Sequence, residues 1–99
     1  MTTKIIRVTI CNKKGLHARA AAKLVKLAAT FDAQVKVFCV APSGEVIASR
    51  SATATSILSL LMLAAEKGTD VELHATGAQS DEALTAIQAL IAQKFDEGE

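Results

Sequence analysis

Residues 6–29 read IRVTICNKKGLHARAAAKLVKLAA and contain two different hydrophobic periods. Apolar and polar residues alternate over 6–10, which is the two-residue period of a strand with one buried face. Over 18–29 the apolar residues recur at helical spacing instead. The stretch therefore predicts a strand, a loop and an amphipathic helix. The helix face expected to be buried consists of Ala21, Leu24, Val25 and Ala28.

The rest of the chain continues to alternate between strands and helices. The predicted elements are a strand over 35–39, a turn over 41–44, a weaker strand over 46–48, a helix from Ile57 closed by Lys67 and Gly68, a strand over 71–75, and a helix with Asp81 and Glu82 in its first turn that buries Leu84, Ile87 and Ile91. The segment over 51–55 is small and polar, and residues 96–99 are expected to fray.

The element order is thus β-α-β-β-α-β-α in a single domain over 1–99. A chain of 99 residues supports one hydrophobic core. The short connection between the second and third strands favours a hairpin and hence antiparallel pairing. We expect an α+β fold, an open-faced sandwich of a four-stranded antiparallel sheet with three helices on one face.

Composition excludes several classes of protein. No apolar run approaches the ~18 residues of a membrane span, and the N-terminus lacks a secretory signal pattern, so we expect a cytoplasmic protein, and a monomer. Cys11 and Cys39 share no metal-ligand spacing, and we interpret both as small buried apolar residues. No metal site or cofactor is predicted.

The charge is unevenly distributed along the chain. The first 31 residues carry seven bases and no acid, whereas the remainder carries four bases and ten acids. Such a basic end favours an anionic ligand or an acidic partner surface. Nucleic acid is disfavoured, because the chain has no Trp or Tyr for base stacking.

The loop over 12–20 is the best candidate for a chemical site, because it leads into the start of a helix. The first turn of a helix offers unpaired N–H groups and a partial positive charge, which suit phosphate. Gly15 would let the loop bend closely, and the Arg19 guanidinium could contact phosphate oxygens. His17 would supply a nucleophilic nitrogen, with its other nitrogen held by a hydrogen bond that fixes the tautomer.

Other interpretations of the histidines remain open at this point. His17 could be a solvated surface residue near a helix start. His74 lies on the expected outward face of its strand without paired ligands, so we interpret it as a surface residue rather than a metal ligand. The sequence contains no Gly-x-Ser-x-Gly motif, which argues against a Ser-His-Asp hydrolase.

Residues 12–26, NKKGLHARAAAKLVK, resemble the active-site signature of the HPr phosphocarriers of the bacterial phosphoenolpyruvate-dependent phosphotransferase system. Residues 55–63, TSILSLLML, resemble a second signature of that family, and Lys67 and Gly68 follow at the expected place. The element order also matches. Residues 60–63 and 95–97 are more similar to the nitrogen-related (NPr-like) branch than to the sugar-transport carriers.

The resemblance implies a role for each residue of the loop. His17 would be phosphorylated on Nδ1 by phosphorylated enzyme I and would pass the group to an EIIA-type histidine. The Ala18 and Arg19 amides would cradle the phosphate, and the Arg19 side chain would stabilise charge during transfer. The chain would be a phosphoryl-transfer intermediate rather than a self-sufficient enzyme. Ala20 replaces the usual proline, which leaves the site geometry open although the helix should survive.

Ser56 and the helix after it have both structural and functional interpretations. Ser56 is a good helix cap, and by resemblance it corresponds to the serine that an HPr kinase/phosphorylase modifies in some bacteria. The apolar residues of the helix could fill the core, yet a short helix buries only one face, so some should form a partner site. The docking residues we expect are Ala18, Ala22, Lys26, Ile57, Leu58 and Leu61.

The leading hypothesis is therefore a histidine phosphocarrier in sugar uptake or in nitrogen and carbon regulation. The alternative is a regulatory interaction module on the same fold, controlled by phosphorylation of Ser56. A third possibility, a small nucleic-acid-binding domain, explains the basic first third of the chain but not the apolar helix.

Overall fold

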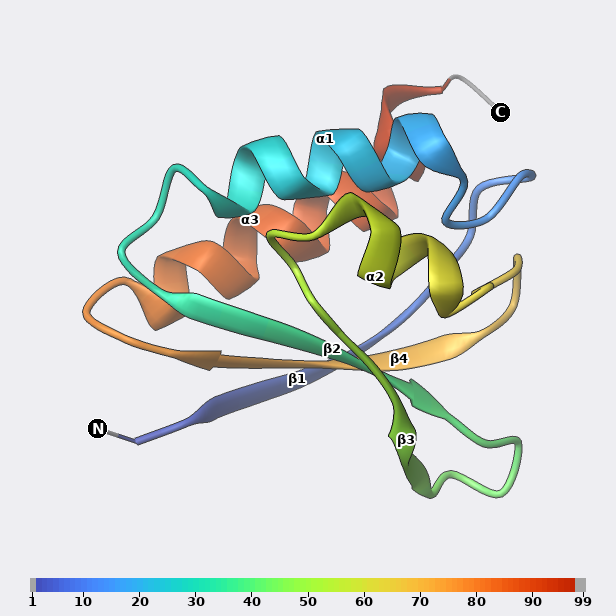
Figure 1. Ribbon diagram of the computed structural model, residues 1–99, viewed down its shortest axis with the longest axis horizontal. Coiled ribbons are helices and arrows are strands. Elements are labelled where there is room, and N and C mark those ends of the chain that lie inside the picture. The colour runs from blue at the N-terminus through green and yellow to red at the C-terminus, as the bar shows by residue number, and fades with distance from the viewer. Residues whose placement is uncertain (1, 98–99) are drawn as a thin grey trace.

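The computed structural model describes residues 2–97, which form a four-stranded sheet with three α-helices packed on one face (Figure 1). In chain order the elements are β1 (Lys4–Thr9), α1 (Ala18–Ala28), β2 (Gln34–Val40), β3 (Val46–Thr53), α2 (Ile57–Met62), β4 (Asp70–Thr76), α3 (Ser80–Ala92) and the 3₁₀ turn η1 (Lys94–Asp96). The strand order is β1-β4-β2-β3, with every neighbouring pair antiparallel. The predicted open-faced sandwich is confirmed. Within residues 2–97 no helix is long and apolar enough to cross a membrane.

The central strand β4 separates the two faces of the sheet. Val71, Leu73 and Ala75 are buried on the face that the helices cover, whereas Glu72 and His74 lie between them on the open face. β4 pairs with β1 from Asp70 to Ala75 on one side and with β2 from Val71 to Thr76 on the other. The alternating pattern of the sequence therefore corresponds directly to an inner and an outer face.

The helices bury the faces that their periodicity predicts. In α1 the buried residues include Ala21, Leu24 and Ala28, and Val25 is half-buried. In α3 the three predicted residues, Leu84, Ile87 and Ile91, are all buried. The helix over 18–29 is thus confirmed, with Ala29 as its C-cap.

The prediction for the third strand was too short. β3 extends over Val46–Thr53 and so includes residues of the segment that we interpreted as small and polar. Ala52 is its one fully buried residue and pairs with Val37 of β2. Because β3 is an edge strand with most of its side chains exposed, its backbone pairs without the alternating apolar pattern that would identify it.

The second helix is shorter than predicted. α2 ends at Met62, with Leu63 as its C-cap, and Ala64 adopts a left-handed conformation with φ of 51°. Lys67 and Gly68 do not close the helix. They belong to the turn before β4, where the Gly68 N–H donates to the Ile10 carbonyl at 2.7 Å. The left-handed residue ends the helix before glycine is reached.

The segment after α3 folds back against the helices. Lys94, Phe95 and Asp96 all have positive φ, and the Phe95 side chain is completely buried. The Lys23 ammonium donates to the Phe95 carbonyl. We expected residues 96–99 to fray, but Asp96 lies in η1 and the Glu97 side chain is hydrogen-bonded; Gly98 and Glu99 lie outside the described residues. Burial of Phe95 holds the segment in place.

Both cysteines are free thiols. Cys39 is buried in the core, and burial raises the pKa of its thiol. Cys11 is half-buried, and its Sγ donates to the Ile91 carbonyl at 3.1 Å. The interpretation of Cys39 as a buried apolar residue is confirmed, whereas Cys11 is only partly covered.

Candidate functional site

His17 caps the start of α1. Its backbone is extended, with φ of −79° and ψ of −178°, and its carbonyl accepts the first helical hydrogen bond from the Ala21 N–H at 2.8 Å. Its side-chain Nδ1 accepts the Arg19 N–H at 3.3 Å. An imidazole nitrogen thus satisfies one of the unpaired donors of the first turn, a role usually taken by Ser, Thr, Asp or Asn.

The loop before His17 is fixed by backbone contacts. Gly15 has φ of 66° and closes a turn in which its N–H donates to the Asn12 carbonyl at 3.1 Å. The Leu16 N–H donates to the Ala65 carbonyl at 2.9 Å, and the Leu16 side chain is buried. The His17 N–H donates to the Gly15 carbonyl at 2.9 Å. The segment that connects α2 to β4 therefore fixes the position of this loop through the Ala65 carbonyl.

The other ring nitrogen of His17 contacts the C-terminal segment. Nε2 is hydrogen-bonded to Glu97 Oε2, and Glu97 Oε1 accepts from Asn12 Nδ2 at 2.9 Å. Asn12 is wholly buried, and the same Nδ2 donates to the Gly15 carbonyl at 2.7 Å. The predicted hydrogen bond to the second nitrogen is present, but the sequence analysis identified neither Glu97 as its partner nor Asn12 as the residue that donates to Glu97.

This geometry defines the protonation of the ring. Nδ1 accepts a backbone N–H, so it carries a lone pair, and the ring proton is therefore on Nε2, where a carboxylate accepts it. The unprotonated nitrogen faces the positive end of a helix dipole. The arrangement combines a nucleophile with a place for an incoming anion.

The remaining residues singled out in this loop differ in their exposure. Ala18 and Arg19 are exposed in the first turn of α1, and no acidic residue occupies that turn. Lys13 and Lys14 are exposed on the loop just before it. Ala20 is completely buried, and α1 still begins at Ala18, so the helix survives without the usual proline as predicted.

The helix α2 lies beside α1 (Figure 1), and several of its exposed side chains are apolar. Leu58 and Met62 retain 68% and 76% exposure, and Ile57 and Leu61 are also exposed. Leu60, in contrast, is completely buried. The interpretation in which these residues merely fill the core is wrong for the four exposed ones. Ala22 and Lys26, two of the expected docking residues on α1, are exposed as well.

Ser56 is the N-cap of α2, as predicted. Its Oγ accepts the Ser59 N–H at 3.2 Å, and its backbone is extended. We expect Ser56→Ala to lower the free energy of unfolding by about 1 kcal/mol, because the first turn loses its acceptor. Urea denaturation measures this loss. Ser59→Ala removes a hydroxyl from the same helix but leaves the cap intact, so equal destabilisation by the two variants would contradict the assignment.

His74 belongs to a separate cluster on the open face of the sheet. Its Nε2 is hydrogen-bonded to Glu72 at 3.0 Å, and its ring packs against Phe38 at 4.5 Å between centroids. Hydrogen bonds from Arg7 and then His74 lower the pKa of Glu72. Within residues 2–97 no cluster of three or more His, Cys, Asp or Glu could hold a metal ion. His74 is half-buried on this face, with 25% of its side chain exposed.

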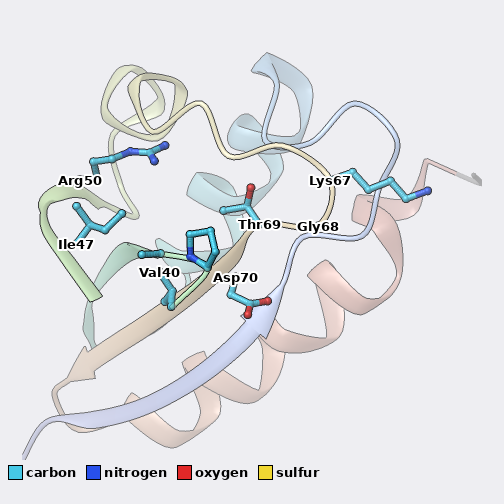
Figure 2. Close-up of a pocket in the computed structure, with 9 residues that line it drawn as sticks. Val40, Ile47, Arg50, Lys67, Gly68, Thr69 and Asp70 are labelled. Atoms are coloured by element: carbon cyan, nitrogen blue, oxygen red, sulfur yellow. The ribbon is translucent and has the colours of Figure 1, made fainter. Parts of the chain in front are cut away.

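A surface hollow of about 390 Å³ lies at the end of the sheet away from β1's N-terminus (Figure 2). Arg50, Lys67, Thr69 and Asp70 are among its lining residues. Figure 2 shows that the Lys67 side chain extends away from Arg50, and the Arg50 guanidinium is already engaged by the Leu63 carbonyl. The hollow therefore lacks converging polar groups, and His17 does not line it.

Comparison with known proteins gives consistent matches. Residues 5–93 match the protein family described as the PTS HPr component phosphorylation site. The chain is 47% identical to the phosphocarrier protein HPr of Pseudomonas aeruginosa, with 95% of this chain and 97% of that protein covered. It is 49% identical to the phosphocarrier protein NPr of Shewanella violacea, with 96% and 97% covered.

A solved structure matches as well. The crystal structure of HPr-C-His from Thermoanaerobacter tengcongensis superposes with a TM-score of 0.82 at 35% identity, and the match covers 95% of this chain and 97% of that one. The relatives named HPr and NPr are about equally similar to this chain, so their names do not separate the two branches.

Proposed function

Because the chain belongs to the HPr family of phosphocarriers of the phosphotransferase system, we propose that His17 accepts a phosphoryl group on Nδ1 from phosphorylated enzyme I. The phosphohistidine then passes the group to a histidine of an EIIA-type domain. The observation that carries this proposal is the placement of an unprotonated Nδ1 at the start of α1, in contact with the Arg19 N–H. We propose the cytoplasm as the compartment of this exchange.

The transfer requires no group beyond two imidazoles and their surroundings. The Nδ1 lone pair forms a bond to phosphorus while the donor's N–P bond breaks, and the donor nitrogen keeps the electron pair. The transferred oxygens then lie at the first turn of α1, where the Ala18 and Arg19 amides are placed to donate to them. The Nδ1···H–N contact of 3.3 Å is long, so the phosphoryl group displaces only a weak hydrogen bond.

Arg19 is proposed to stabilise charge during transfer. Its side chain is exposed beside the cap, so the guanidinium can reach oxygens that are shared between two proteins. The neighbouring Lys13 and Lys14 add positive charge to the same loop. Charge of this kind stabilises the transition state in either direction, as a carrier requires.

The apolar surface of α2 is proposed as the docking site for both partners. Ile57, Leu58 and Leu61 are exposed on α2, which packs against α1, and Ala22 and Lys26 are exposed on α1. An apolar centre with a basic rim suits acidic partners that must bind briefly and dissociate. A carrier needs one surface for donor and acceptor, because the same histidine must face each in turn.

We expect Leu58→Glu to raise the KM for phosphorylated enzyme I about tenfold, with kcat little changed, because it places a charge at the centre of the surface. Initial rates of transfer measured against donor concentration give both constants. Ile5→Glu is the matched control, since Ile5 is also an exposed apolar residue but lies on β1. Equal effects of the two substitutions would remove α2 from the docking site.

The proposed function is tested by incubating the protein with phosphoenolpyruvate and enzyme I. Intact mass spectrometry should detect the addition of one phosphoryl group, and mild acid should remove it, because phosphohistidine is acid-labile whereas phosphoserine is not. Addition of an EIIA domain should return the chain to its original mass. An unchanged mass in the first step, or a label that survives acid, would overturn the proposal.

Phosphorylation of Ser56 is a second, regulatory candidate. Ser56 lies directly before the docking helix, so a phosphate on its Oγ would place negative charge beside Ile57 and Leu58. It would weaken binding to acidic partners while contacting the N–H groups of the first turn of α2. Incubation with an HPr kinase/phosphorylase and ATP, with Ser56→Ala as control, tests this candidate.

A further inference from the structure

We propose that Glu97 is a positioning residue for phosphoryl transfer, whose carboxylate keeps the ring proton of His17 on Nε2 and stabilises the charge that the ring gains when Nδ1 is phosphorylated. The inference rests on the proposed function of His17. Glu97 lies beyond residues 5–93, the part of the chain that matches the family.

The contact is held from both sides of the carboxylate. Oε2 is hydrogen-bonded to His17 Nε2, and Oε1 accepts from Asn12 Nδ2 at 2.9 Å. The Glu97 side chain retains only 5% exposure, whereas that of His17 retains 23%. A charged hydrogen bond that is shielded from water is stronger than an exposed one. This contact can therefore determine which ring nitrogen of His17 carries the proton.

The Asn12 side chain holds Glu97 and the loop before His17 together. Its amide is completely buried, and Nδ2 donates both to Glu97 and to the Gly15 carbonyl. Among residues 2–97 its Oδ1 has no hydrogen-bond partner. An unpaired buried acceptor is destabilising, so the amide keeps an orientation that is unfavourable for its own oxygen. That orientation serves the carboxylate and the loop that carries His17.

Burial of Phe95 positions Glu97 beside His17. Three consecutive left-handed residues, Lys94 to Asp96, turn the chain back after α3, and the buried Phe95 ring anchors the turn. The Phe95 carbonyl also accepts from Lys23 of α1. In Figure 1 the C-terminal segment lies beside the start of α1. The carboxylate therefore reaches the ring from an anchored segment.

The chemistry explains why a carboxylate is useful at this nitrogen. When the Nδ1 lone pair forms the bond to phosphorus, the ring still carries the proton on Nε2 and becomes a phosphoimidazolium cation. The proton stays in the hydrogen bond to Glu97 Oε2, and the carboxylate offsets the new positive charge. When the phosphoryl group leaves for the acceptor, the electron pair returns to Nδ1 and the neutral tautomer is restored. No proton is exchanged with solvent in either direction.

The test compares Glu97→Ala with Asp96→Ala, which removes an exposed carboxylate from the adjacent residue. Imidazole ¹⁵N shifts of resting His17 report the tautomer, and transfer from phosphorylated enzyme I gives kcat and KM. For Glu97→Ala we expect loss of the fixed Nε2–H tautomer and a fall in kcat of about 10- to 100-fold, with an unchanged KM. Asp96→Ala should match the unsubstituted chain in both measurements.

Two results would overturn the inference. One is a Glu97→Ala variant whose tautomer and kcat match those of Asp96→Ala. The other is a lost tautomer preference with an unchanged kcat, which would make the contact purely structural. If the unsubstituted chain accepts no phosphoryl group at all, the proposed function fails and the transfer role of Glu97 fails with it. The ¹⁵N shifts then still decide whether the Glu97 contact exists, so the two failures are distinguishable.

Discussion

Substitution of His17 by alanine is expected to abolish acid-labile phosphorylation of the chain by enzyme I and phosphoenolpyruvate. No other nitrogen nucleophile lies at a helix start in the described part of the chain: His74, the second histidine of the sequence, is in the middle of β4. Its Nε2 is hydrogen-bonded to Glu72, and its ring packs on Phe38, so it has neither helix amides nor a basic loop beside it. The expected effect is complete loss of the phosphorylated species by intact mass.

His74→Ala is the matched control for this experiment. It removes the same side chain from the opposite face of the sheet and should leave the extent and rate of phosphorylation unchanged. His17→Ala removes the weak capping hydrogen bond to the Arg19 N–H and the contact to Glu97, and circular dichroism checks that the variant still folds. A label that persists in His17→Ala and disappears in His74→Ala would move the carrier site to the open face of the sheet.

The parts of the fold that the sequence predicts well are those with a strong local period. Val71, Leu73 and Ala75 alternate with polar residues and are all buried in β4. β3 was truncated in the prediction because the residues around Arg50 are exposed, so its pairing with β2 depends on backbone hydrogen bonds that leave no hydrophobic pattern. Hydrophobic periodicity in the sequence cannot identify an edge strand of this kind.

The end of α2 could not be predicted for a different reason. The residue that ends the helix, Ala64, adopts a left-handed conformation, although alanine is the best helix former. The glycine that the sequence offers as a stop, Gly68, lies four residues further along the chain. Contacts of this segment with the His17 loop, including the Leu16 hydrogen bond to Ala65, override the local preference.

The candidate site divides in the same way into local and distant parts. His17 and Arg19 were identified from the loop itself, because their roles depend on the helix that follows directly. Glu97 is separated from His17 by 80 positions, and no local pattern encodes such a contact. The one available signal was Phe95, an apolar residue beyond the last helix that needed a place in the core. Burial of Phe95 anchors the segment in which Glu97 contacts His17.

Gly15 links the stability of the fold to the geometry of the site. It adopts φ of 66°, and a Cβ built on it would lie 2.5 Å from the Ala65 carbonyl oxygen and 2.9 Å from the Glu66 Cα. Both are backbone atoms that cannot rotate away. The same Ala65 oxygen accepts the Leu16 N–H. A displacement of the loop around Ala65 would therefore also move Leu16, the residue before His17.

We expect Gly15→Ala to lower the free energy of unfolding by about 3 kcal/mol, the sum of an unfavourable left-handed alanine and a backbone clash. Gly68→Ala separates these two causes, because Gly68 has φ of 92° but no atom within 4 Å of its Cβ position, so about 1 kcal/mol is expected there. Urea denaturation of both variants measures the difference. In the folded fraction of Gly15→Ala, transfer to His17 should also slow by about tenfold or more, because displacement of the loop misplaces Nδ1. Equal destabilisation of the two variants, with normal transfer in both, would mean that the loop accommodates a Cβ at Gly15 and that its contact with Ala65 does not position the histidine.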